Sequence, residues 1–329
     1  MTKSAGNKQS NTNVNSRLKT YVSLGMRNPR WLIMYCLSRF VFVREAVKFM
    51  HTRPAIDQYN LSASKFKNIN VNNFVTALQR DGFCTDIMLP EDMVNEILNF
   101  AATAYCYGDA NPRYGFRYAD KTAAQAASKC VFSLATYFFD DALQPIVDKL
   151  ANDPALLAIA TKYLGSKVTI TGHQLWWTFA ATEAEFNSSR TSSFFHYDKD
   201  DYAGLRFFFY LTTVDPDHGP HVVVRGSHVR KKLSQIISLG ERSDEDIVDC
   251  YGSDNLVTIF GKPGAGFAED PFCFHKATRP RAGDRLLLLV TYATRDYNIF
   301  PSLDRSASAN ILGDKINPNQ SWESGTSVR

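Results

Sequence analysis

The pattern of hydrophobic positions changes character near residue 164. Beyond it the chain consists of short apolar runs rich in β-branched and aromatic residues, separated by turn-rich text such as DPDHGP and RPRAGD. The runs are KVTITGHQLWWTFA, SFFHYD, LRFFFYLTTV, HVVVRGS, NLVTIF, DPFCFHKA and RLLLLVTYAT. Such runs predict strands, and many short strands close together predict a sandwich or jelly roll. One helical insertion is expected between residues 231 and 250.

Before residue 164 the spacing of apolar residues predicts mainly helices. The segment VNNFVTALQRDG (71–82) fits a helix, FCTDIML (83–89) a short strand, and PEDMVNEILNFAATAY (90–105) a second helix. More helix is expected between residues 121 and 164. The predicted fold class is therefore α+β, a double-stranded β-helix (jelly-roll or cupin-like) core with flanking helices that are mostly N-terminal.

The ends of the chain have their own character. Residues 1–16 are polar with almost nothing to bury, which predicts a flexible tail, and residues 301–329 predict a polar C-terminal tail. Residues 17–60 form a basic amphipathic extension, expected to be helical from Pro29 to about Met50. Residues 61–300 are then expected to form a single jelly-roll domain with a helical N-terminal part.

Composition and charge narrow the class of protein. The 329 residues are 44% hydrophobic with a formal net charge of +4, which excludes a disordered chain and predicts no nucleic-acid partner. Residues 1–56 carry ten Lys or Arg and one acid, a net charge of +9, which leaves −5 for the remainder. Six widely spaced cysteines without a CxxC pair indicate a reducing, cytoplasmic compartment. The start lacks the apolar region of a signal peptide, and the longest apolar stretch, 31–43, is too short to span a bilayer.

One histidine motif suggests a metal site. In FFHYDKD, His196 and Asp198 are two residues apart, so a strand would present an imidazole and a carboxylate on one face. A further histidine from another strand, best supplied by His275, completes the two-His-one-carboxylate set that holds Fe(II). Arg285 follows ten residues later, where its guanidinium can pair with a carboxylate. The plain alternatives are ordinary polar groups on strands and a structural salt bridge, which the joint spacing disfavours. No second metal site is expected from His218, His221 and His228.

Several stretches resemble one family. LQRDGFCTDIMLPEDMVNEIL resembles the family's opening, FHYD its metal motif, DPDHGPHVVVRGSHVRKK the segment that follows, and HKATRPRAGDRLLLLVTYA its distal histidine and cosubstrate arginine. Over about residues 70 to 297 the chain thus resembles the phytanoyl-CoA dioxygenase family of Fe(II)- and 2-oxoglutarate-dependent oxygenases. It departs where the family usually has Asn, Pro and an upstream Lys, which here are His218, Arg225 and the pair Trp176 and Trp177. These departures concern the substrate pocket and remove no ligand.

The resemblance implies an activity and its cofactors. It makes His196, Asp198 and His275 the iron ligands and Arg285 the residue that binds the distal carboxylate of 2-oxoglutarate. The implied enzyme is a non-haem iron dioxygenase that uses O2 to hydroxylate an unactivated C–H of a small-molecule, lipid-like or natural-product substrate, and converts 2-oxoglutarate to succinate and CO2. Because related halogenases lack the carboxylate and bind halide in its place, the presence of Asp198 favours hydroxylation.

Alternatives stay open for the function and for the substrate pocket. The second function class is a cupin-like metal-binding isomerase or binding protein that does not use 2-oxoglutarate, and Arg285 argues against it. Gln174, Trp176 and Thr178 share strand parity and are predicted to line the substrate pocket, although a tryptophan here is equally consistent with core packing. Arg206 is either a contact for an anionic substrate or a structural ion pair, and the second is favoured.

The basic extension also has two interpretations. Between residues 27 and 53, aromatic and aliphatic residues interleave with Arg and Lys, which suits a helix packed on the acidic body or one lying at an anionic membrane surface. Packing is favoured, because most apolar stripes in soluble proteins face a core. The expected partners are a small-molecule substrate and, on the second interpretation, a membrane contacted peripherally through residues 17–56. The oligomeric state is not predicted.

Overall fold

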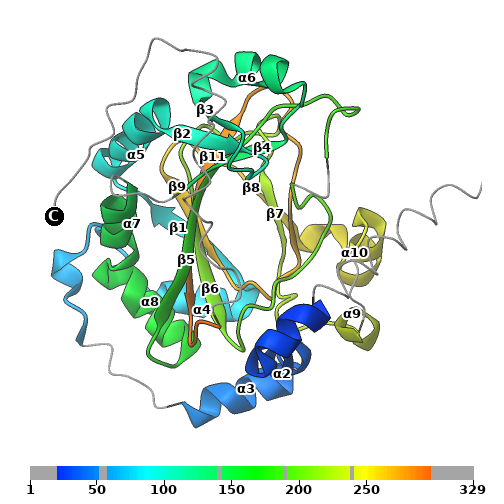
Figure 1. Ribbon diagram of the computed structural model, residues 1–329. Coiled ribbons are helices and arrows are strands. Elements are labelled where there is room, and N and C mark those ends of the chain that lie inside the picture. The colour runs from blue at the N-terminus through cyan, green and yellow to red at the C-terminus, as the bar shows by residue number, and fades with distance from the viewer. Residues whose placement is uncertain (1–20, 52–57, 139–142, 188–190, 238–240, 298–329) are drawn as a thin grey trace, which may run out of the picture.

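Two antiparallel sheets that face each other form the centre of the protein (Figure 1). The structure is a computed structural model that describes residues 21–51, 58–138, 143–187, 191–237 and 241–297. The larger sheet has the strand order β1-β9-β6-β11-β5-β4-β2-β3, and the smaller has the order β10-β7-β8. The strands are β1 (Phe83–Met88), β2 (Tyr105–Gly108), β3 (Gly115–Arg117), β4 (Leu134–Tyr137), β5 (Thr169–Thr178), β6 (Gly204–Tyr210), β7 (His221–Val224), β8 (Leu256–Ile259), β9 (Ala265–Glu269), β10 (His275–Ala277) and β11 (Arg285–Ala293).

From β6 onward the chain passes back and forth between the two sheets. Strand β6 lies in the larger sheet, β7 and β8 in the smaller, β9 in the larger, β10 in the smaller and β11 in the larger. This alternation is that of a double-stranded β-helix, and the predicted α+β jelly-roll fold is confirmed.

The larger sheet buries a different set of side chains on each face, because successive strand residues point to opposite sides. On β6, Phe207 and Phe209 belong to the core beneath the helices, whereas Phe208 and Tyr210 pack toward the smaller sheet. Strand β11 alternates in the same way. The space between the sheets is called here the barrel interior, and its apolar lining includes Phe208, Tyr210, Leu287, Leu289 and Val223.

Helices cover the outer face of the larger sheet (Figure 1). They are α4 (Val71–Asp81), α5 (Glu91–Thr103), α7 (Leu143–Ala151) and α8 (Pro154–Leu164), and α6 (Lys121–Ser128) lies near one end of the barrel. Helix α4 starts where the side chain of Asn70 accepts a hydrogen bond from the Asn73 N–H, and it ends at Gly82, whose φ of 84° favours glycine. Two short helices, α9 (Leu233–Ile237) and α10 (Asp244–Tyr251), form the insertion between β7 and β8.

The described part of the basic extension is helical over residues 21–27, in α2 (Pro29–Leu37) and in α3 (Val41–Met50). The prediction of one helix from Pro29 to about Met50 is therefore wrong at residues 38–40, where the chain turns. The turn lets Trp31 on α2 and Arg44 on α3 both become buried. The predicted tails at 1–16 and 301–329 lie outside the described residues. None of the helices in the described ranges has both the length and the apolarity needed to cross a bilayer.

Several strands differ from the sequence prediction. Strand β4 lies inside the segment expected to be helical between residues 121 and 164, because it pairs with β5 over Leu134–Tyr137. Strand β9, with the sequence AGFAE, was not expected because Gly and Ala have low strand propensity. It is a strand because it lies between β1 and β6 and pairs with both.

Candidate metal centre

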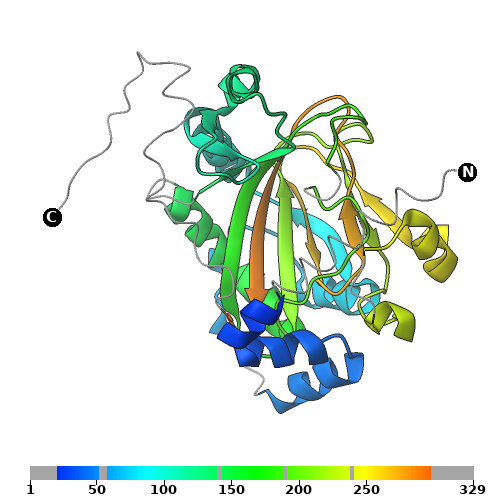
Figure 2. The same ribbon diagram turned by 45° about the vertical axis from the view of Figure 1, so that its right-hand side comes forward.

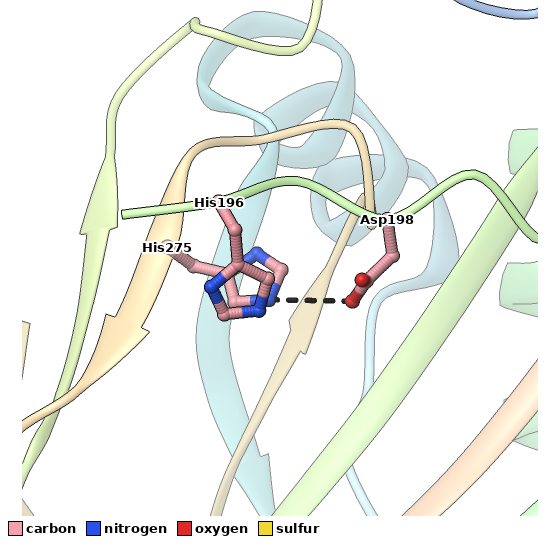
Figure 3. A group of neighbouring side chains, drawn as sticks. All are labelled: His196, Asp198 and His275. Atoms are coloured by element: carbon pink, nitrogen blue, oxygen red, sulfur yellow. Dashed lines mark ion pairs between the residues drawn. The ribbon is translucent and has the colours of Figure 1, made fainter. Parts of the chain in front are cut away.

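His196, Asp198 and His275 lie together at the barrel interior (Figure 3). His275 begins β10, and His196 lies opposite it in an antiparallel bridge in which the two residues exchange N–H to carbonyl bonds of 3.1 and 2.9 Å. The N–H of Asp198 donates to the carbonyl oxygen of Pro271 at 2.8 Å. One donor atom from each of the three side chains lies within 4.8 Å of the other two. The structure thus brings the three predicted metal-binding residues together.

Two carboxylates flank the imidazole of His275. Its Nε2 lies 3.5 Å from Asp198 Oδ2, and its Nδ1 lies 2.7 Å from Glu269 Oε1. Burial alone would lower the pKa of His275, but Glu269 and Asp198 raise it to about 10. The imidazole is therefore held with Nδ1 toward Glu269 and the carbonyl oxygen of Cys273, at 3.0 Å, and with Nε2 toward Asp198.

Glu269 is a site residue that the sequence analysis missed. It lies at the end of β9 with 1% of its surface exposed, and its second oxygen is 2.6 Å from His221 Nε2. Burial would raise the pKa of Glu269, but the two histidines lower it to about 2, so the carboxylate is charged. Strand parity carries the signal that could have found it, because Phe267 and Glu269 share the interior face of β9. The other contact of Glu269, His221, is not among the three residues of the candidate metal centre.

Arg206 forms an ion pair with the candidate ligand Asp198. Its guanidinium contacts Asp198 Oδ2 through one nitrogen and Asp200 Oδ2 through the other. Burial would raise the pKa of the Asp198 carboxyl. The positive charge of Arg206, together with His275 and His196, instead holds this pKa well below its usual range. The structural ion pair was the favoured interpretation of Arg206, and the structure confirms that contact.

Arg285 is a buried cation at the start of β11. It is 2% exposed; its Nη2 donates to Thr178 Oγ1 at 3.1 Å, and its Nη1 contacts the carbonyl oxygen of Gly219. No carboxylate in the described part of the chain pairs with it, and its Nε has no hydrogen-bond partner there. Burial lowers the pKa of Arg285. A desolvated guanidinium with only neutral partners favours the binding of an anion.

The three predicted pocket residues share one face of β5. Thr178 pairs in register with Arg285, and Trp176 and Gln174 pair with Leu287 and Leu289. Thr178 contacts the Arg285 side chain, and Trp176 packs against the barrel interior. Gln174 is exposed. The structure therefore places Thr178 and Trp176 at the interior and leaves Gln174 at its margin.

Comparisons with known proteins give structural likeness only. No protein-family model and no curated protein matches the chain. The crystal structure of SnoN, a non-heme alpha ketoglutarate dependent epimerase from nogalamycin biosynthesis, is 16% identical over 71% of this chain and 88% of that chain, with a TM-score of 0.47. EctD from S. alaskensis in its apoform is 19% identical over 70% of this chain and 79% of that chain, with a TM-score of 0.43. AviO1 from Streptomyces viridochromogenes Tue57 is 14% identical over 69% of this chain and 96% of that chain, with a TM-score of 0.41. At TM-scores below 0.5, the likeness does not decide the activity of this chain.

Proposed function

We propose that the protein is an Fe(II)- and 2-oxoglutarate-dependent dioxygenase that hydroxylates an unactivated C–H of a small-molecule, lipid-like or natural-product substrate. In this reaction O2 is consumed and 2-oxoglutarate is converted to succinate and CO2. The observation that carries the proposal is Arg285, a buried guanidinium without a carboxylate partner among the described residues, on the same barrel interior as two histidines and an aspartate.

The donor set suits Fe(II). Two imidazole nitrogens and one carboxylate oxygen form the facial set used by non-haem iron oxygenases, and it leaves coordination positions open for other ligands. The 2.7 Å contact between His275 Nδ1 and Glu269 is the kind of outer contact that orients a metal-binding imidazole. The residues present therefore fit the metal that the resemblance implies.

The other residues of the site bind, orient and exclude water. Arg285, steadied by Thr178, would bind the distal carboxylate of 2-oxoglutarate through a two-pronged contact. Arg206 contacts the Asp198 carboxylate and would hold its orientation, and the stacked rings of Phe208 and Phe267 in the barrel interior would keep water from the reacting atoms. Bound Fe(II), with 2-oxoglutarate and O2, supplies the oxidising chemistry.

Asp198 bears on the outcome at carbon. Its carboxylate occupies the position that is open to halide in related halogenases, so the proposed reaction is hydroxylation. The alternative, a cupin-like isomerase or binding protein without 2-oxoglutarate, gives no role to the charge of Arg285, which has no carboxylate partner among the described residues, and is disfavoured for that reason.

Succinate release tests the proposed function. Purified protein with Fe(II), 2-oxoglutarate and a panel of candidate substrates should release succinate with at least one of them, and the product mass should rise by one oxygen. His275→Ala should lose both turnover and Mn²⁺ binding, whereas His51→Ala, outside the barrel interior, should keep both. A rearranged product formed without succinate would favour the isomerase, and a chlorinated product in chloride buffer would contradict hydroxylation.

We infer a peripheral membrane contact for the outer face of α2 and α3. Arg44 of α3 points inward, where it contacts the carbonyl oxygen of His228 and stacks on Phe272, while Phe42 and Phe49 are 72% and 84% exposed. A surface helix normally has the reverse polarity. An apolar outer face on a segment of net charge +9 suits an anionic membrane. Co-sedimentation with vesicles tests this inference. A cytoplasmic location stays a prediction.

A further inference from the structure

A basic pocket lies outside the candidate metal centre, between the segment that follows β7 and the end of α10. It encloses about 340 Å³ and is lined by Arg225, Arg230, Lys231, Lys232, Cys250, Tyr251 and Asn255. Four of these residues are cationic, and no described acidic residue lines the pocket. A concave site lined by one sign of charge concentrates the opposite charge from solution.

The positive charges of the basic pocket are only partly neutralised. Arg225 forms an ion pair of 2.7 Å with Asp81. Arg230 and Lys232 are exposed, and neither pairs with a carboxylate in the described ranges. Lys231 donates to the carbonyl oxygens of Ser227, at 2.6 Å, and Phe272. Burial lowers the pKa of Lys231 to about 7, so Arg230 and Lys232 supply the positive charge that no described carboxylate neutralises.

Hydrogen bonds hold the walls of the basic pocket in place. The Tyr251 hydroxyl donates to the carbonyl oxygen of Arg230 at 2.6 Å, and the Asn255 side chain donates to the carbonyl oxygen of Tyr251 at 2.7 Å. The N–H of Arg225 donates to the carbonyl oxygen of Asn255 at 2.8 Å. The Arg230 guanidinium lies against Gly226, whose φ is 69°. Hydrogen bonds therefore fix the backbone that carries Arg225 and Arg230.

We propose that the basic pocket binds the phosphate group of a phosphomonoester or a diphosphate. Two guanidinium groups and an ammonium group match a multiply charged oxyanion better than a single carboxylate. The volume of about 340 Å³ exceeds that of one phosphate, so it leaves room for a second phosphate or for part of an organic group beside the ring of Tyr251. The pocket is independent of the proposed oxygenase activity, because none of its cations contacts His196, Asp198 or His275.

The phosphate could belong to a soluble compound or to a phospholipid headgroup. Leu233 and Ile237, which follow the cationic run on α9, are 63% and 61% exposed. In both cases Arg230 and Lys232 would bind the phosphate. Pyrophosphate is the probe for a soluble compound, and vesicles containing phosphatidic acid are the probe for a headgroup.

The test compares one double variant with a control of equal charge change. Pyrophosphate is titrated into full-length wild type, into Arg230→Ala/Lys232→Ala, and into Arg113→Ala/Lys167→Ala, whose exposed side chains lie outside the pocket. Binding should weaken at least about tenfold in the pocket variant and stay within about twofold in the control. Thermal unfolding and Mn²⁺ binding should match in all three proteins.

A vesicle arm separates the two sources. Vesicles containing phosphatidic acid are co-sedimented with the same three proteins. Pyrophosphate binding that the pocket variant loses identifies a soluble phosphate compound. A loss confined to the vesicles, absent from the control, identifies a headgroup. Equal weakening in both variants overturns the proposal, because it would show that overall charge and not the basic pocket determines binding. Failure of the wild type to bind either probe also overturns it.

Discussion

Arg285 and Glu269 are both buried charged residues, and their partners differ. Arg285 has only neutral partners, Thr178 and Gly219, among the described residues. Glu269 lies between two histidines at 2.7 and 2.6 Å. The Arg285 guanidinium is therefore proposed to bind an anionic ligand. The Glu269 carboxylate already contacts two histidines and is proposed to orient His275.

Replacing Arg285 with Lys should weaken the binding of 2-oxoglutarate while Mn²⁺ still binds. The ammonium keeps the charge but loses the two-pronged geometry, so KM for 2-oxoglutarate should rise by about 10- to 100-fold. Steady-state kinetics measure this change. The control is Arg281→Lys, because Arg281 forms a surface ion pair of 2.7 Å with Asp217. An unchanged KM in the Arg285 variant, with a raised one in the Arg281 variant, would move the anion site to the neighbouring turn.

Replacing Glu269 with Gln should lower metal affinity about 10- to 100-fold, because the carboxylate orients His275. Calorimetric titration with Mn²⁺ measures the affinity, and Glu96→Gln, an exposed carboxylate on α5, serves as the control. The carboxylate also raises the proton affinity of His275, so titrations at two pH values separate orientation from proton competition. Equal affinities for the wild type and Glu269→Gln at both pH values would leave Glu269 a purely structural residue.

At the scale of elements, the end of α4 links the helical layer to the metal centre. Gly82 has a φ of 84°, and a Cβ there would collide with Cys273 Sγ, two residues before His275. Gly82→Ala should therefore lower the free energy of unfolding by about 3 kcal/mol, from backbone strain and overpacking together. Gly165 ends α8 with a φ of 67° and has nothing within 4 Å of an added Cβ, so Gly165→Ala should cost only ~1–2 kcal/mol. Urea unfolding compares them, and equal losses would show that the collision relaxes away.

The elements that the sequence predicts well are those whose pattern is local. Helix α4 agrees with the expected segment 71–82, because the residues that begin and end it, Asn70 and Gly82, are neighbours of the helix in the sequence. The two-residue spacing of His196 and Asp198 in FFHYD predicted that the two side chains lie together, and they do. The strand expected there is wrong, because only Phe195 and His196 form isolated bridges. Strand β9 could not be predicted in this way, since its strand character comes from β1 and β6 on either side. Glu269 was missed with it, because its role depends on two histidines distant in the chain.

The whole molecule separates its charge and its exposed apolar surface. Residues 1–56 carry +9 while the remainder carries −5, and α3 presents Phe42, Phe49 and Met50 outward on one stripe. The exposed aromatic side chains belong to α3, which with α2 lies at one end of the barrel in Figure 2. The packing that the sequence favoured is present on the inner face through Trp31 and Arg44. The outer face of α2 and α3, which exposes Phe42 and Phe49, is the face proposed to contact a membrane.

Vesicle binding should depend on that outer face. Phe42→Ala/Phe49→Ala should lower binding to anionic vesicles about tenfold or more, because two rings no longer leave water. Phe260→Ala, which removes a 50% exposed ring elsewhere, should leave binding unchanged, and vesicles without anionic lipid should bind little. Co-sedimentation measures the bound fraction. Failure of the wild-type protein to bind, combined with self-association that the double variant abolishes, would instead assign the face to a second copy.

The guanidinium of Arg285, which no carboxylate of the described residues neutralises, has a consequence for how the proposed enzyme would respond to metabolism. Succinate keeps the carboxylate that Arg285 is proposed to bind, so the product competes with the cosubstrate for the same buried charge. Other dicarboxylates of similar length would compete in the same way. The rate in the cell would then follow the ratio of 2-oxoglutarate to succinate, and the enzyme would slow whenever succinate accumulates even if its own substrate is abundant.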